Sequence, residues 1–135
     1  MNKQNKTWLL AVLIFSIAST SIHYTDNAIF IRQYPEPEWI TTSGVFISWG
    51  VMTSIAIMSY LLYSKQYYWL SYLFLGIYSV TGLSSPTHYL YGALSQFSVK
   101  MHAFIWTDAI AGLAVIAFGI WSALITQEWR SVKEV

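Results

Sequence analysis

The chain has 135 residues, of which 56% are hydrophobic, 18% are aromatic and only 10% are charged. About a quarter of the residues are charged in an ordinary soluble domain, so this composition argues against one. The net charge of +1, with its basic residues scattered, argues against a nucleic-acid partner. The absence of cysteine excludes disulfides, thiolate metal sites, cysteine nucleophiles and thioether-linked haem.

Four hydrophobic segments account for most of the sequence, and in chain order they are residues 7–31, 39–63, 67–85 and 101–127. Each is long enough to cross a bilayer, which requires about 20 mostly apolar residues. The breaks between them carry turn-forming residues, and no segment alternates polar and apolar side chains. We therefore predict an all-α integral membrane four-helix bundle with up-down-up-down topology. It forms a single transmembrane domain over residues 1–135.

The basic residues near the segment ends predict the orientation. With the N-terminus inside, the inner side receives five lysines and arginines and the outer side only two, Arg32 and Lys100. The inner residues are Lys3, Lys6, Lys65, Arg130 and Lys133. Because cytoplasmic loops carry the excess of Lys and Arg, we expect both termini in the cytoplasm. The first segment also resembles a secretory signal, but its cleavage would strand the apolar residues 28–31.

The ionisable residues of the apolar segments are expected in one layer near the outer face. His23 lies about 22 Å into the first segment at 1.5 Å per residue, with Asp26 one turn further on. His88 follows the third segment, and His102 and Asp108 begin the fourth. A carboxylate at the bilayer centre costs about 2.5–3.5 kcal/mol and needs a partner. Both aspartates are therefore expected to face the bundle interior.

Small residues on the fourth segment predict its packing face. Gly112 and Gly119 share a helical face with His102, and small residues let membrane helices approach closely. We therefore expect His102 to face the bundle interior. Asp108 lies about 120° around the helix axis from His102, so both side chains can face the bundle interior only if a wide sector of this helix is buried.

The polar layer contains the side chains of a metal site. Imidazole nitrogen and carboxylate oxygen bind zinc and iron, and catalytic sites often combine three protein ligands with an open water position. We predict that His23, His88 and His102 bind a divalent metal, zinc or iron. Asp26 and Asp108 would act as ligand, orienting group or general base in chemistry on an apolar or lipid substrate.

A short motif resembles that of a known enzyme superfamily. Ser19-x-x-x-His23 is similar to the Ser-x3-His element of the membrane hydrolases that include the alkaline ceramidases, and Ser84 and His88 have the same spacing. The resemblance implies zinc chemistry in a helical bundle. It covers only these residues, because the superfamily's paired histidines at i and i+4 near its end are missing here.

Three other functions fit the same residues. Haem binding would place His23 opposite His88 or His102, as in membrane cytochromes. A non-catalytic accessory subunit of a membrane complex would use the polar cluster only for structure. Proton transport is disfavoured, because the ionisable residues of the segments occupy only the outer layer. The expected partners are the lipid bilayer, an apolar small molecule, and a second copy of the chain or a larger membrane complex.

Overall fold

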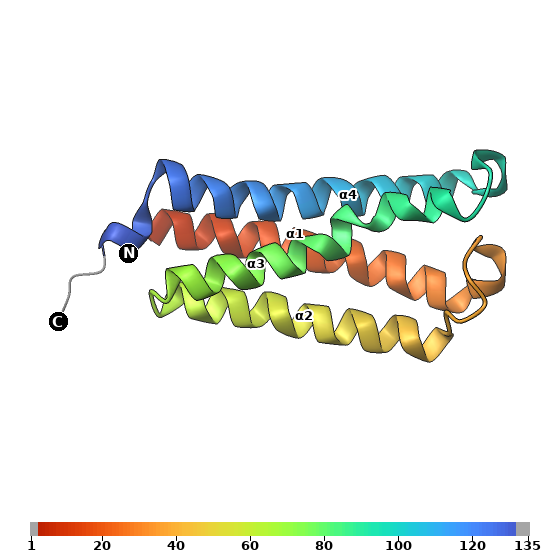
Figure 1. The fold of residues 1–135 in the computed structure, drawn as a ribbon, viewed down its shortest axis with the longest axis horizontal. Coiled ribbons are helices and arrows are strands. Elements are labelled where there is room, and N and C mark those ends of the chain that lie inside the picture. The colour runs from red at the N-terminus through yellow and green to blue at the C-terminus, as the bar shows by residue number, and fades with distance from the viewer. Residues whose placement is uncertain (1–2, 132–135) are drawn as a thin grey trace.

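The computed structural model describes residues 3–131, and these residues form helices without any β-strand. The four main helices are α1 (Lys3–Ile29), α2 (Thr42–Ser64), α3 (Tyr68–Leu83) and α4 (Val99–Ile120). Consecutive helices run antiparallel, and α4 packs back on α1 to close the bundle (Figure 1). The predicted all-helical four-helix bundle is confirmed for the described residues. Lys133, which entered the charge comparison, lies outside them.

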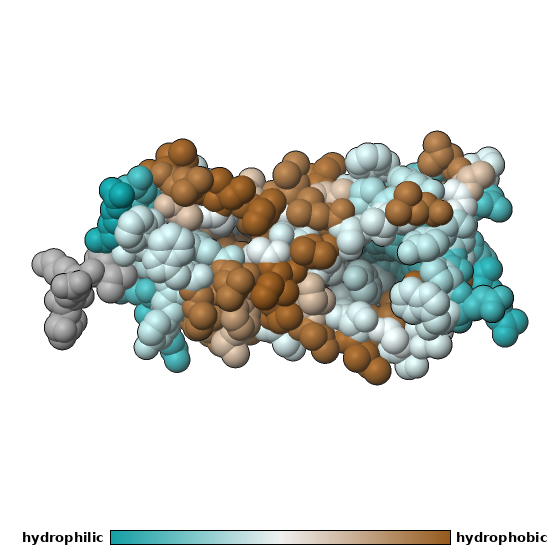
Figure 2. Space-filling model, viewed as in Figure 1, coloured by the Kyte–Doolittle hydropathy of each residue, from teal (hydrophilic) through white to brown (hydrophobic). Residues whose placement is uncertain are grey.

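Three of the helices are long and apolar enough to cross a membrane: α1, α2 and the stretch from Val99 to Ile125. The third predicted segment is shorter than expected. Its helix α3 has 16 residues, about 24 Å at 1.5 Å per residue, against a hydrocarbon core of about 30 Å. Hydrophobic side chains cover the middle of the bundle and polar ones gather at its two ends (Figure 2).

The α3 helix stops because of Pro86. Proline lacks the N–H that a regular α-helix needs and disfavours the helical conformation of the preceding residue. The chain continues as the 3-10 helix η2 (Ser85–Leu90) in the same general direction (Figure 1). A short 3-10 helix, η3 (Leu94–Gln96), then leads to α4.

A side-chain cap marks the start of α2. The Thr41 hydroxyl accepts the Gly44 N–H at 3.1 Å at the start of α2, which satisfies one free donor of the first turn. The 3-10 helix η1 (Ile31–Gln33) precedes it. Beyond α4 the chain forms one π-helical turn, η4 (Trp121–Ile125), and the 3-10 helix η5 (Glu128–Ser131).

A pair of glycines brings α3 against α4. A Cβ added to Gly82 would lie 2.2 Å from the Asp108 carbonyl oxygen, and one added to Gly112 would lie 2.7 Å from the Leu83 nitrogen. Only hydrogen fits at either position. Because its far end is held on α4, α3 diverges from α2 as it runs away from the termini (Figure 1).

The buried face of α4 includes Asp108. Gly112 and Gly119 are buried as expected, whereas His102 is only half-buried. The predicted inward position of His102 is therefore only partly correct. Residues at three- and four-residue steps share a face, and the buried residues of α4 are Met101, Ile105, Asp108, Ala111, Gly112, Val115, Phe118 and Gly119.

Candidate functional site

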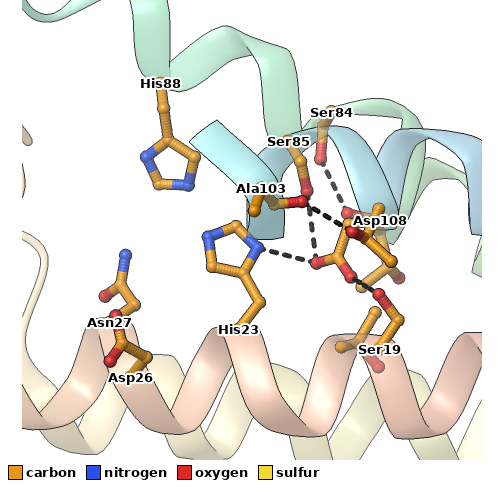
Figure 3. A network of polar contacts seen from close by, with 12 residues as sticks. Ser19, His23, Asp26, Asn27, Ser84, Ser85, His88, Ala103 and Asp108 are labelled. Atoms are coloured by element: carbon orange, nitrogen blue, oxygen red, sulfur yellow. Dashed lines mark hydrogen bonds and ion pairs between the residues drawn. The ribbon is translucent and has the colours of Figure 1, made fainter. Parts of the chain in front are cut away.

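Asp108 is the centre of a buried polar cluster, and its side chain is 0% exposed. Its carboxylate accepts hydrogen bonds from the Ser19 hydroxyl, from His23 Nδ1 at 2.7 Å and from the Ser85 hydroxyl at 3.5 Å (Figure 3). Ser19 and His23 lie one turn apart on α1, so the Ser-x3-His spacing lets both reach one carboxylate. These hydrogen bonds compensate the cost of burying the carboxylate.

His23 is oriented by this carboxylate. Hydrogen bonding through Nδ1–H to Asp108 leaves the lone pair on Nε2, as in the histidines of catalytic triads. The Nε2 atom is buried and has no hydrogen-bond partner among the described residues. In Figure 3 the ring turns this edge away from Asp108, toward the space between His88 and Asn27.

A second imidazole–carboxylate pair lies beside the first. His88 Nδ1 lies 3.2 Å from Glu36 Oε1, and the ring centroids of His88 and His23 are 5.4 Å apart. The Glu36 side chain is only 4% exposed, and its Oε1 also accepts a hydrogen bond from the Asn27 amide. The sequence analysis did not identify Glu36 as a site residue. A signal that could have drawn attention to it is its position between Pro35 and Pro37, because each proline fixes φ and so stiffens this connection.

Both histidines line one cavity of about 410 Å³. Its walls come from α1, from residues 36–48 before and within α2, and from residues 81–88 at the end of α3 and in η2. The cavity therefore occupies the gap left where α3 diverges from α2. Its lining combines aromatic and apolar side chains with hydroxyls and the two histidines, as in small-molecule sites.

Asp26 takes part in a different contact. Its carboxylate lies 2.5 Å from Lys100 Nζ and accepts the Tyr34 hydroxyl at 2.8 Å. Burial, and then this hydrogen bond, raise the pKa of Tyr34, so the phenol stays protonated. Asp26 thus pairs with a lysine and a tyrosine rather than with a histidine. It joins α1 to the start of α4.

His102 also lies in a separate cluster. Its Nδ1 is 2.7 Å from the Tyr89 hydroxyl, and its ring packs against Phe97. Asp108 comes six positions after His102 on α4, so the two residues differ by about 9 Å along the helix axis and by about 120° around it. Within residues 3–131, no group of three or more His, Asp or Glu side chains is arranged to hold a metal ion. The structure brings His23 and His88 together and does not support the three-histidine set.

A further buried carboxylate, which the sequence analysis missed, lies at the end of the bundle where α1 begins and α4 ends. Glu128 is 6% exposed and accepts hydrogen bonds from the Tyr63 hydroxyl and, at 2.8 Å, from the Ser122 hydroxyl. The chain turns at Gln127, with φ of 49°, and so carries Glu128 back under the helices. The expected layer concerned only the ionisable residues within the apolar segments, and Glu128, which directly follows the fourth segment, adds a buried carboxylate at the other end of the bundle.

Comparisons of the chain with protein-family models, with curated proteins and with solved structures give no match. A functional assignment therefore rests on the geometry of the two imidazole–carboxylate pairs and of the cavity between them.

Proposed function

We propose that this protein is a multi-pass membrane enzyme that transfers protons to and from an apolar small molecule bound in the cavity. One observation carries the proposal: His23 lines the cavity, and its buried Nε2 atom has no hydrogen-bond partner among the described residues. An unsatisfied buried polar atom costs about 1–3 kcal/mol, so it marks a place where a ligand supplies the missing partner.

The chemistry is a paired acid and base. His23 Nε2 accepts a proton from the bound molecule, and Asp108 stabilises the imidazolium that forms. His88, in its protonated form beside Glu36, returns a proton to another atom of the same molecule. The net reaction is an isomerisation without any oxidant or co-reactant, and the two histidines regain their protonation through water at the cavity mouth. Such acid–base catalysis contributes about 10²–10⁴-fold in rate.

The proposal includes insertion in a membrane with both termini in the cytoplasm and the cavity in the outer half of the bilayer. The hydrophobic middle of the bundle and the bias of basic residues support this orientation. The gap between α2 and α3 then opens toward lipid, which gives an apolar molecule a lateral entrance. A single cysteine at position 65 should react with an impermeant reagent only after the membrane is permeabilised. Labelling from outside would reverse the orientation.

Histidine NMR tests the proton-transfer step. The chain has three histidines, so a sample with ¹⁵N-labelled histidine in lipid nanodiscs gives three imidazole signal sets, which His→Gln variants assign. We expect a proton on Nδ1 and a free lone pair on Nε2 of His23 in a sample at pH 7, because Nδ1 bonds to the Asp108 carboxylate. Doubly protonated His23 at that pH would contradict the proposal, because it has no lone pair with which to accept a proton.

A deuterium-uptake experiment tests turnover. Nanodiscs carrying the native lipid extract are incubated in D₂O, and the extracted molecules are examined by mass spectrometry for deuterium at carbon. We expect uptake that falls about 10²-fold or more in His23→Gln and persists in His102→Gln. Equal uptake in His23→Gln and the unmodified protein would refute His23 as the base.

A metal on His23 and His88 is the second candidate. Each imidazole bonds to a carboxylate through Nδ1, which is the arrangement usual behind metal-bound histidines. Elemental analysis of the purified protein tests this candidate, and a visible spectrum tests for haem. Bound zinc or iron that disappears in His23→Gln and His88→Gln, but not in His102→Gln, would favour the metal.

A further inference from the structure

Two buried acceptor atoms of the cavity are not used by the proposed proton transfer. Glu36 Oε2 and Asn27 Oδ1 are both buried, and neither has a hydrogen-bond partner among the described residues. The two side chains are adjacent, because the Asn27 amide donates to the other carboxylate oxygen of Glu36. Both residues line the cavity, and Figure 3 shows the Asn27 side chain rising from α1 toward the space below His88.

We propose that the bound molecule is an amphiphile whose protonated primary amine sits between Glu36 and Asn27. This inference rests on the proposed function, because it names the class of molecule that the same cavity holds. A primary ammonium carries three N–H donors and no acceptor, so it satisfies both atoms. A hydroxyl has a single donor and leaves one of them unsatisfied.

The charge of the cavity favours a cation over a neutral amide. Its described lining residues include Glu36 but no lysine or arginine, and with Asp108 bonded to His23 the two carboxylates outnumber the one imidazolium of the proposed mechanism, His88. A positive head group offsets the cost of keeping the Glu36 carboxylate away from water, and a neutral donor does not. Hydrogen bonds between an ammonium and a carboxylate are about twice as strong as neutral ones.

The rest of the lining suits an apolar body attached to the amine. Tyr24 and Trp39 contribute aromatic rings, and Ile40 and Val45 contribute aliphatic surface. Aromatic rings also attract a nearby cation through their faces. With the head group held at Glu36 and Asn27, the apolar body fills the rest of the cavity, which His23 also lines.

Calorimetric titration of the full-length protein in nanodiscs tests this class. The probes are octylamine, octanol and octyltrimethylammonium, which share a chain and differ in charge and donors. We expect octylamine to bind at least tenfold more tightly than the other two. Glu36→Gln should remove this advantage, whereas Asp26→Asn should keep it. Asp26→Asn is the control, because it also replaces a carboxylate by an amide, but at a residue of α1 that is not among the lining residues of the cavity.

Each outcome decides a separate question. Equal affinities of octylamine and octanol for the unmodified protein would overturn the amine proposal, even if Glu36→Gln does not fold. Preference for octyltrimethylammonium would refute the role of N–H donors, and Zn²⁺ that displaces octylamine with higher affinity would make the site a metal site. The NMR state of His23 is read without any amine, so failure of the proton-transfer proposal is distinguished from failure of this one.

Discussion

Substitution of Gly112 by alanine tests the helix crossing on which the site is built. The new Cβ would lie 2.7 Å from the Leu83 nitrogen and 2.8 Å from the Ser79 carbonyl oxygen, and both are backbone atoms that cannot rotate away. Overpacking costs about 1–3 kcal/mol, and two backbone contacts place this case near 3 kcal/mol. Alanine regains about 1 kcal/mol of helix propensity. We expect a net loss of about 2 kcal/mol in the free energy of unfolding.

Thermal unfolding in detergent measures this loss. For a chain of this length, 2 kcal/mol corresponds to a decrease in Tm of about 6 °C. Gly76→Ala is the matched control, because it lies in the interior of α3 and a Cβ there meets nothing within 4 Å. The control should be unchanged or more stable by up to about 1 kcal/mol. Equal Tm values for the two variants would show that α3 and α4 do not approach as closely as this reasoning requires.

Three further substitutions separate the roles of the polar groups. Glu128→Gln should lower the free energy of unfolding by about 1–2 kcal/mol, because a buried acceptor of the Ser122 hydrogen bond is replaced by an amide; an unchanged melting curve would refute this. Asp26→Asn should cost less than about 1 kcal/mol in the same assay, because its partner Lys100 is 44% exposed. His102→Gln should leave bound metal and His23 signals unchanged, and a loss of metal would restore the three-histidine prediction.

The number and type of the helices were predictable from the sequence. Long apolar runs broken by turn-forming residues determine where helices fall, and the structure agrees for α1, α2 and α4. Burial of Asp108 was also predictable, because an apolar helix gives a carboxylate nowhere else to be stable. Asp108 pairs with His23, and both residues belong to the layer that the sequence predicts. Which histidine contacts Asp108 was not predictable, because this contact depends on how each helix is rotated about its own axis.

The residues that the sequence analysis missed lie outside the apolar segments. Glu36 and Glu128 follow helix ends, where a carboxylate ordinarily faces water, and only a turn in the backbone brings each one under the bundle. Turns such as the one at Gln127 arise from tertiary contacts rather than from local periodicity. The 3-10 form of η2 is likewise set by Pro86 together with the packing of α3 on α4. A pattern of hydrophobic residues contains no signal for these features.

Replacement of Pro86 by alanine tests whether the early end of α3 forms the second imidazole–carboxylate pair. Alanine permits a regular α-helix to continue through residue 88. A 3-10 helix turns about 120° and rises about 2.0 Å per residue, against about 100° and 1.5 Å in an α-helix. Over the three steps from Ser85 to His88, the side chain would rotate by about 60° and move back by about 1.5 Å. The 3.2 Å contact with Glu36 does not survive such a change.

We therefore expect the ¹⁵N signals of His88 to shift and the octylamine affinity to fall, while the signals of His23 remain. Unchanged His88 signals would mean that packing on α4, and not Pro86, holds η2 in its 3-10 form.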